Sequence, residues 1–169
     1  AVGGIKAILK KKISVTENVC NIRSKKINPR FFTYHEKKRP YVIIKAALTL
    51  DGFIAESNGI SKWITNEYSR QSVHELRSSC DAILIGNKTA LIDNPSLDSR
   101  GKGKDPIPII IDRSNSLRKN LKIFKKTPIV LSSDIINSKP LNNVKIMLDV
   151  LYERNIQSVL VEGGGFTIT

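Results

Sequence analysis

The sequence predicts an α/β fold in which a mainly parallel sheet carries helices on both faces. The first observation is a set of short apolar runs with the length and composition of strands buried on both faces: "YVIIKAALTL", "DAILIG", "IPIIID" and "PIVLSS". The second is that segments with a helical spacing of apolar residues lie between several of these runs. Strands that alternate with helices indicate βαβ units and therefore a parallel sheet.

In chain order, residues 3–15 predict an amphipathic helix and then a strand that begins near Ile13. Residues 20–39 are polar and basic, with Phe31 and Phe32 as their expected anchors. Pro40 marks a boundary, because the residue before a proline is pushed out of helical geometry. Beyond it we predict strands at residues 41–50, 53–55, 81–86, 107–112, 128–133 and 159–161, and helices at residues 66–80, 87–93 and around 144–152.

Local signals support the helices. Thr65 is expected to cap the helix at residues 66–80, because its hydroxyl can accept from a free backbone N–H of the first turn. The buried stripe of this helix is expected to consist of Val73, Leu76 and Cys80. Asp51 and Gly52 form a turn signal after the first long strand.

The composition argues against several classes of function. Hydrophobic residues make up 40% of the 169 residues, which is enough to form a core. The net charge of +13 sits mostly on residues 1–40, which carry eleven Lys or Arg against two Glu. No nucleic-acid-binding motif accompanies these charges, so we expect a solvated basic face and no nucleic-acid partner. No apolar run approaches the roughly 20 residues of a membrane span, so we predict a cytoplasmic protein without a membrane partner.

Cys20 and Cys80 are isolated and have no His or Cys partner at the spacing of metal ligands. We therefore predict two reduced, buried thiols and no metal site.

Several polar residues fall where predicted strands end, which is where open α/β sheets bind ligands. Lys45 interrupts an apolar strand, and a polar cleft explains it slightly better than a side chain that reaches out to solvent. Glu162 ends the last strand before three glycines, where a carboxylate can accept hydrogen bonds from a ligand. The triple glycine is not a dinucleotide-binding fingerprint.

One face of the predicted helix at residues 66–80 carries Arg70, His74 and Arg77. Either this face is solvated, or the guanidinium of Arg77 binds a phosphate. His74 is expected to be a surface histidine. Trp63 is expected in the core, although its ring could also stack on a nicotinamide or a base. The residues alone thus predict a cleft for a phosphorylated ligand.

Four blocks in this order, "RPYVIIKAALTLDGFIA", "SKWIT", "LRSSCDAILIGNKTALIDNPSLDSR" and "SVLVEGGG", resemble the reductase domain of the bifunctional riboflavin-biosynthesis deaminase/reductase over residues 39–165. The resemblance implies a dihydrofolate-reductase-like fold. It divides the chain into the tail of a deaminase domain with a linker, residues 1–39, and a reductase domain, residues 40–169. The deaminase zinc motifs, HxE and PCxxC, are absent from the sequence, so no deaminase activity is expected.

The resemblance further implies NADPH-dependent reduction of the ribosyl group of 5-amino-6-(5-phosphoribosylamino)uracil to the ribitylamino product. It puts Lys45 close to the reacting sugar. The residues implied in binding the phosphorylated pyrimidine substrate are Ser61, Arg77, Leu97, Arg100 and Glu162. Those implied in binding NADPH are Ala47, Trp63, Thr89, Asp93, Ser114 (with Arg113 as the alternative for the 2′-phosphate), Gly164 and Gly165.

Two other functions stay open from the sequence: another dihydrofolate-reductase-like enzyme acting on a folate or pterin, and, more remotely, a basic nucleic-acid-binding module. The resemblance also implies a homodimer when the domain is complete, and a family pattern that continues beyond both ends of this chain. The few residues after the glycines are too short for a stable helix. We therefore expect the chain by itself to bind NADPH poorly, to have little reductase activity and to self-associate.

Overall fold

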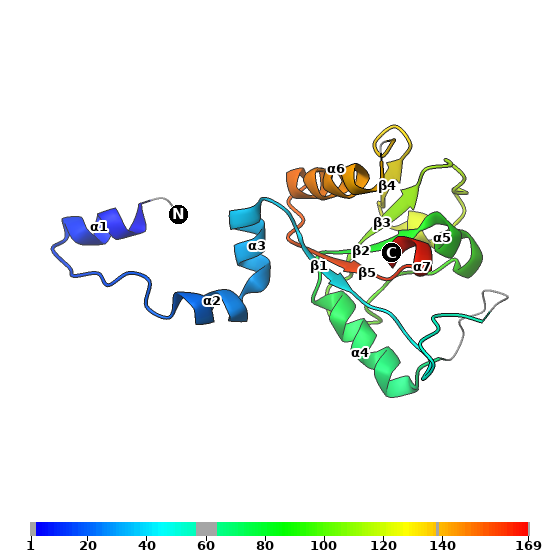
Figure 1. The fold of residues 1–169 in the computed structure, drawn as a ribbon, viewed down its shortest axis with the longest axis horizontal. Helices are drawn as coiled ribbons and strands as arrows, with labels where there is room; N and C mark the ends of the chain where they lie inside the picture. Colours follow the sequence, from blue (N-terminus) through cyan, green and yellow to red (C-terminus); the bar gives the residue numbers. More distant parts are fainter. Residues whose placement is uncertain (1–2, 57–63, 138, 169) are drawn as a thin grey trace.

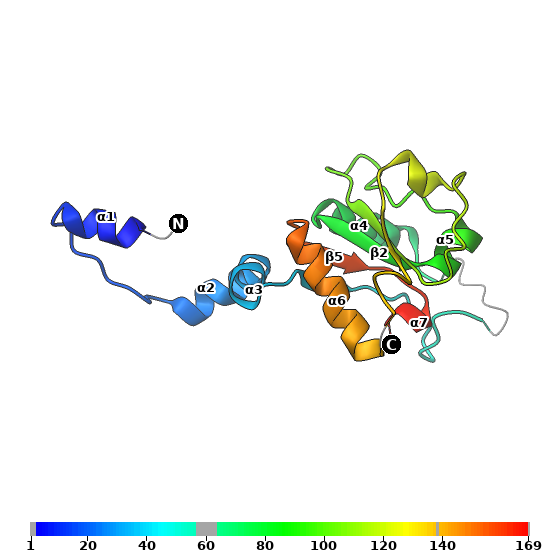
Figure 2. The ribbon, with the colours of Figure 1, turned by 90° about the horizontal axis from the view of Figure 1, so that it is seen from above.

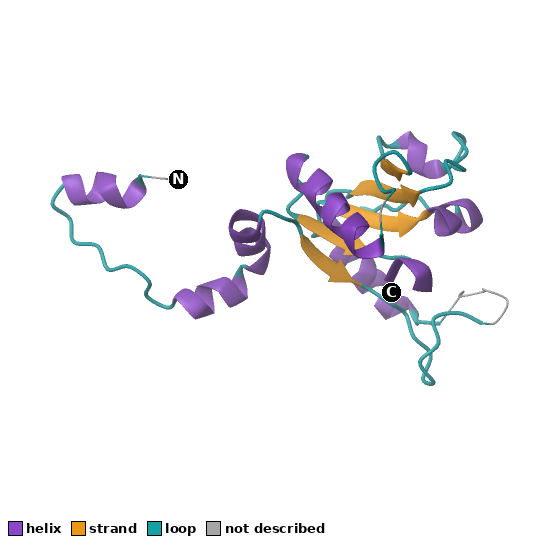
Figure 3. Ribbon diagram, turned by 45° about the horizontal axis from the view of Figure 1, so that its top comes forward, coloured by secondary structure: helices purple, strands orange, loops and turns teal. Residues whose placement is uncertain are grey.

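A five-stranded, entirely parallel sheet forms the centre of the protein in a computed structural model that describes residues 3–56, 64–137 and 139–168. The strand order is β1-β5-β2-β3-β4, which Figure 3 shows as a twisted row of strands. The strands are β1 (Tyr41–Ile44), β2 (Ala82–Gly86), β3 (Ile107–Asp112), β4 (Ile129–Ser132) and β5 (Ser158–Val161).

Helices cover both faces of this sheet, which confirms the predicted fold class. Side chains alternate between the faces, so Leu84 and Val161 pack in one cluster and Ile83 and Leu160 in the other. The first cluster includes Leu151 of α6 (Pro140–Glu153). The second lies under α4 (Glu67–Ser78), α5 (Asn87–Asp93) and the 3₁₀ turn η1 (Lys122–Lys125). Figure 2 shows α6 and α4 on opposite sides of the sheet.

The start of α4 differs from the prediction by one residue. Asn66, and not Thr65, is the N-cap, because its Oδ1 accepts from the backbone N–H of Ser69 at 3.0 Å. Of the predicted stripe, Leu76 and Cys80 pack toward the sheet, whereas Val73 is half-buried and lies outside this cluster.

The segment after Pro40 was predicted as a ten-residue strand buried on both faces, which is wrong in length and in burial. β1 ends at Ile44, because its partner strand β5 ends at Val161 and runs into the glycine turn. β1 lies at the edge of the sheet, so Ile44 is 58% exposed and Leu50 is fully exposed. The expected short strand at residues 53–55 is instead part of a turn, in which the N–H of Thr49 donates to the Phe53 carbonyl.

The basic N-terminal region consists of three short helices, α1 (Gly4–Lys10), α2 (Asn21–Ile27) and α3 (Pro29–Lys37). Figure 1 shows α1 and α2 extending away from the sheet. The strand predicted near Ile13 is absent, because residues 13–18 have no neighbouring strand to pair with. Cys20 is exposed between α1 and α2, so the prediction of two buried thiols is correct only for Cys80.

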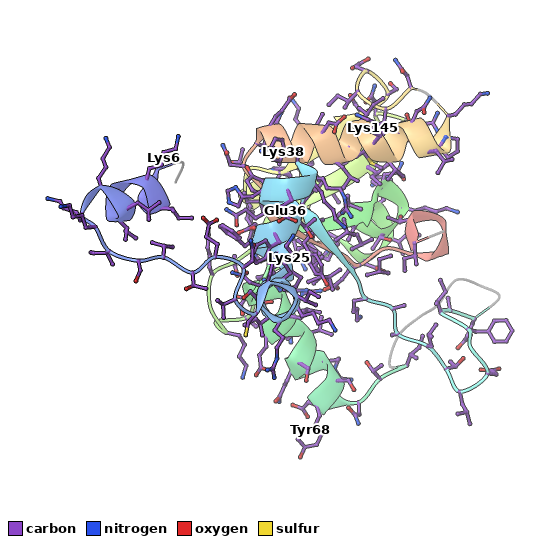
Figure 4. All side chains as sticks on the ribbon, turned by 60° about the vertical axis from the view of Figure 1, so that its left-hand side comes forward. Lys6, Lys25, Glu36, Lys38, Tyr68 and Lys145 are labelled. Atoms are coloured by element: carbon purple, nitrogen blue, oxygen red, sulfur yellow. The ribbon has the colours of Figure 1, made fainter. Side chains whose placement is uncertain are left out.

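Tyr34 anchors α3 to the rest of the protein, whereas of the two predicted anchors Phe31 is exposed and Phe32 is half-buried. The Tyr34 ring packs on that of Tyr152 in α6 at 4.8 Å between centroids, while Phe31 is 46% exposed. Lys25 and Glu36 join α2 to α3 through an ion pair of 2.8 Å, and both are labelled in Figure 4. In the described residues, no helix is long and apolar enough to cross a membrane.

The glycines after β5 lead into a single helical turn, α7 (Gly165–Ile168). α7 has only four residues, so the expectation that this segment is too short for a stable helix stays a prediction. The N–H of Thr167 donates to the Gly164 carbonyl at 2.9 Å and closes the turn. α7 lies against the end of β2, where a Cβ on Gly86 would be 2.8 Å from Thr167 Oγ1 and one on Gly163 would overlap the Thr167 side chain. Glycine is needed at these two positions for close approach.

Candidate active site

A cleft of about 700 Å³ opens at the carboxyl ends of β1 and β5. Its base follows these two strands, one wall is α4, and the other is the loop that follows α5. Its charged lining consists of Lys45, Glu67, Arg70, Arg77, Asp93, Asp98, Arg100, Lys102, Lys122 and Glu162. Basic groups outnumber acidic ones in this lining, and the cleft lies at the end of a parallel sheet where ligands bind.

The register of the sheet brings Lys45 and Glu162 together. Ile44 and Val161 are paired in the parallel ladder, and Lys45 and Glu162 are the next residues on their strands. The N–H of Lys45 donates to the Val161 carbonyl at 3.0 Å, and the N–H of Glu162 donates to the Leu84 carbonyl at 3.0 Å. By strand alternation both side chains lie on the face that α4 covers, so an ammonium and a carboxylate reach the same cleft.

Arg77 of α4 forms a two-pronged ion pair with Glu162. Its Nε lies 3.0 Å from Oε1 and its Nη2 lies 2.8 Å from Oε2. The two side chains are only 15% and 10% exposed. The remaining nitrogen, Nη1, donates to the carbonyl of Asp98 at 3.2 Å. The guanidinium therefore connects α4, β5 and the loop after α5, and a phosphate bound at Arg77 would share it with Glu162.

The loop that presents Arg100 is held by Asp105. The backbone N–H and the hydroxyl of Ser99 each donate to Asp105 Oδ1 at 2.8 Å, and Lys126 pairs with Oδ2 at 2.9 Å. Ser99 is fully buried, and the next residue, Arg100, has a left-handed φ of 48°. The N–H of Ser99, then Lys126 and the Ser99 hydroxyl, lower the pKa of Asp105 to about 2.

We expect Asp105→Asn to lower the free energy of unfolding at neutral pH by about 1 kcal/mol, a figure reduced for the partial exposure of the carboxylate. The pKa of Asp105 in the folded chain, about 2, lies below its ordinary value of 3.8. Its contribution is therefore complete above 3.8 and is lost as the pH falls toward about 2.

Urea unfolding of the wild type and Asp105→Asn across this pH range tests the linkage. The matched control is Asp149→Asn, which removes a carboxylate from the exposed pair with Lys145 on α6. A difference between wild type and Asp105→Asn that stays constant down to pH about 2 would contradict the assignment.

His74 lies in the wall of the cleft and is not the surface histidine that the sequence predicts. Its Nδ1 is buried and has no hydrogen-bond partner among the described residues. Burial first, and then the charges of Arg77 and Arg100, lower the pKa of His74 below its ordinary value of 6.5. The imidazole is therefore neutral at neutral pH, inside a cleft with a basic excess.

A second polar cluster lies at the carboxyl ends of β2 and β3. Asp112 is 2% exposed and accepts from the backbone N–H groups of Ser116 and Leu117 at 3.2 and 3.1 Å. Asn87 Nδ2 donates to Ser114 Oγ at 2.9 Å and lies 3.2 Å from Asp112 Oδ1. This network fixes the turn after β3, so the exposed residues 113–116 have a defined backbone.

The cleft brings together the predicted site residues Lys45, Arg77, Asp93, Leu97, Arg100 and Glu162. Ala47, Thr89, Ser114, Gly164 and Gly165 lie outside its lining, the last three near the ends of β2, β3 and β5. Ser61 and Trp63 lie outside the described residues. Within the described chain, no group of three or more His, Cys, Asp or Glu side chains is arranged to hold a metal ion.

Sequence reasoning missed three residues that shape the cleft: Asp98, Ser99 and Asp105. They lie in a polar loop whose composition gave no signal beyond flexibility. A Ser and an Asp six residues apart were compatible with a closed loop, but nothing local required it.

A parallel sheet with helices on both faces and a charged cleft at its strand ends, with more basic than acidic groups in the lining, defines an α/β protein with a candidate ligand site. The chain belongs to the RibD C-terminal domain family, whose family model matches residues 40–169.

Individual relatives agree with this assignment. The riboflavin biosynthesis protein RibD of Aquifex aeolicus is 33% identical, over 98% of this chain and 52% of that protein. A crystal structure of a diaminohydroxyphosphoribosylaminopyrimidine deaminase/5-amino-6-(5-phosphoribosylamino)uracil reductase from Thermotoga maritima is 38% identical, with a TM-score of 0.82, and the match covers 98% of this chain and 50% of that one. The riboflavin biosynthesis reductase Rib7 of Saccharomyces cerevisiae is 27% identical, with a TM-score of 0.59 over 80% of this chain and 72% of that one. The chain thus spans about half the length of the RibD relatives that it matches.

Proposed function

We propose that this chain is the reductase domain that converts the ribosyl group of 5-amino-6-(5-phosphoribosylamino)uracil to the ribityl group, with NADPH as the reductant. The observation that carries the proposal is the convergence of Lys45, Arg77, Arg100 and Glu162 on one cleft in a chain of this family. The Thermotoga maritima relative is named for this reductase activity.

On the substrate side, two arginines and one carboxylate have different roles in binding. Arg100 projects from a loop held by Asp105 and meets the substrate phosphate, since a guanidinium makes charge-assisted bonds to phosphate oxygens. Arg77 holds Glu162 in place and adds a second positive charge, while Glu162 accepts hydrogen bonds from the substrate. Leu97, which is buried beside this loop, and Ser61 complete the substrate contacts.

Lys45 acts at the reacting sugar. Lys45 and Glu162 follow paired positions of β1 and β5 and line the same cleft, so their two charges orient the sugar chain. As the C1′ carbon is reduced, negative charge develops on the attached heteroatom, and a positioned ammonium stabilises that charge or delivers a proton to it. The protein's contribution is orientation and electrostatics.

The residues at the ends of β2, β3 and β5 fit a dinucleotide. The space around Gly164 is open, with no atom within 4 Å of a Cβ built there, which suits close approach of a ligand to the backbone. The exposed turn after β3 offers Ser114 and, beside it, Arg113 to a 2′-phosphate. We assign NADPH to these groups together with Ala47, Trp63, Thr89, Asp93 and Gly165. When bound, NADPH supplies the hydride.

The direct test is an assay of NADPH oxidation with 5-amino-6-(5-phosphoribosylamino)uracil, its dephosphorylated form and dihydrofolate as alternative substrates. In a protein extended to the length of the RibD relatives, we expect turnover with the phosphorylated pyrimidine, a large loss for the dephosphorylated form, and none with dihydrofolate. The chain by itself should show the same order of preference at a much lower rate. Reduction of dihydrofolate, or equal rates with and without the phosphate, would reject the proposal.

We expect Arg100→Ala to raise the KM for substrate about 10- to 100-fold while the affinity for NADPH stays nearly unchanged, because the substrate phosphate loses a charged hydrogen-bond partner. Steady-state kinetics with each substrate varied in turn gives both constants. The matched control, Lys104→Ala, removes a positive charge from the same loop outside the cleft and should change neither constant. Equal losses for substrate and NADPH would contradict the assignment.

We expect Gly163→Ala to weaken NADPH binding about tenfold or more, because the new Cβ would overlap the Thr167 side chain and displace α7 from the end of β2. A fluorescence titration with NADPH measures the affinity. Gly4→Ala in α1 is the steric control, since its Cβ would have no neighbour within 4 Å and it lies outside the proposed cofactor site. A Gly163→Ala protein with unchanged affinity would exclude this turn from the cofactor site.

A further inference from the structure

His74 occupies a position in the cleft that the proposed reaction leaves without a role. It lies on the face of α4 that also carries Arg77, one turn further along the helix. Its Nδ1 is buried and makes no hydrogen bond with any described residue. A buried nitrogen without a partner is unfavourable, and because His74 lines the polar cleft, a ligand that reaches the ring after a small side-chain movement would supply the missing hydrogen bond.

Charged groups from α4, from the loop after α5 and from the ends of β1 and β5 line the cleft that contains this imidazole. The strongest electrostatic influences on it are the positive charges of Arg77 and Arg100, which disfavour its protonated form. Asp98 raises the pKa of His74, through a hydrogen bond with its backbone and through the negative charge of its carboxylate. The other nearby charges that line the same cleft are Arg70 on α4, Glu162 after β5 and Lys45 after β1.

An anion bound in the cleft would change the electrostatic environment of His74. Burial and the two arginines hold the imidazole neutral while the cleft is empty. A phosphate dianion bound by the arginines would offset both positive charges at short range. The main electrostatic reason for His74 to stay neutral would then disappear, and an attractive charge would replace it.

We propose that His74 is a proton-linked anion contact, which is neutral in the empty cleft and takes up one proton from solvent when a phosphorylated ligand binds between Arg77 and Arg100. The imidazolium then adds a third positive charge to the phosphate site. This inference rests on the proposed function, because it requires that the cleft receive the substrate phosphate. Ligand binding becomes tighter as the pH falls through the range in which His74 gains its proton.

The sequence offers an unusually clean probe, because it contains only two histidines. His35 lies on α3, exposed and in contact with Phe31, and serves as an internal reference. Proton NMR follows the ring signals of both residues against pH, with ribose 5-phosphate, inorganic phosphate or ribose added. His74→Gln and His35→Gln assign the signals, and each variant removes one titrating ring.

Ribose 5-phosphate should raise the midpoint of the His74 titration and leave that of His35 unchanged, while ribose should move neither. Each unit of that rise corresponds to a tenfold tightening of binding below both midpoints. Accordingly, His74→Gln should bind ribose 5-phosphate up to about tenfold more weakly than wild type at slightly acidic pH and equally at alkaline pH.

Different results would contradict the proposed function and the proton-linked role of His74. If ribose 5-phosphate binds and the His74 midpoint does not move, the proton-linked role is wrong while the proposed function stands. If Arg100→Ala and wild type both fail to bind ribose 5-phosphate, the phosphate site itself is wrong, and the His74 proposal falls with it.

Discussion

Replacing Lys45 with methionine is expected to lower turnover about 100-fold or more while the fold remains intact. Methionine retains most of the aliphatic stem and removes only the ammonium. Lys45 lies at the end of an edge strand and is partly exposed, so little of the core depends on it. The loss should appear in kcat, because the charge is needed when the sugar carbon is reduced.

Steady-state kinetics and thermal unfolding of Lys45→Met and wild type provide the test. Lys145→Met is the matched control, since it removes an ammonium from the exposed surface of α6 (labelled in Figure 4) and should leave kcat unchanged. A Lys45→Met protein with near-normal turnover, or one that does not fold, would show that the residue has no catalytic role.

Breaking the Arg77–Glu162 pair is expected to lower the free energy of unfolding by about 3 kcal/mol in either Arg77→Ala or Glu162→Ala. Both side chains are nearly buried, and removal of one leaves the other charge without its partner in a poorly hydrated site. Replacing both residues with methionine should recover much of this stability, because no unpaired charge remains. Turnover should not recover, since the substrate still lacks the guanidinium and the carboxylate.

Urea unfolding of the wild type, the two single alanine variants and the double alanine variant yields the coupling energy between the residues, which we expect to be about 2 kcal/mol. The exposed Lys145–Asp149 pair provides the comparison and should give at most about 0.5 kcal/mol. A coupling near zero between Arg77 and Glu162 would mean that the pair does not organise the site. Recovery of turnover in the double methionine variant would show that neither residue is needed for substrate binding.

Most elements of the sheet domain were predictable from local sequence. β2, β3 and β5 are short, apolar and bounded by turn residues, and each forms near the predicted position. The N-terminal region and the stretch after β1 were less predictable, because their apolar residues are exposed in the structure. Leu50 and Ile13 have strand-forming neighbours in the sequence but no strand beside them to complete a ladder.

The residues of the site were likewise only partly predictable from the sequence. Lys45 and Glu162 were identifiable because each places a charge at the end of an apolar run. His74 was not, because a histidine on a polar helical face looks the same in sequence whether it faces solvent or a cleft. Asp105 was also missed, since its hydrogen bonds depend on how the loop from Ser99 closes.

Local sequence is enough to predict the α/β class and the residue types available for chemistry, because the periodicity of apolar side chains acts over a few residues. The assembled sheet, in contrast, established the strand order β1-β5-β2, which puts Lys45 beside Glu162. It also decided the pairing of Arg77 with Glu162, which lie 85 residues apart in the chain. Such contacts depend on the free energy of packing the whole sheet and its covering helices, which no local segment contains.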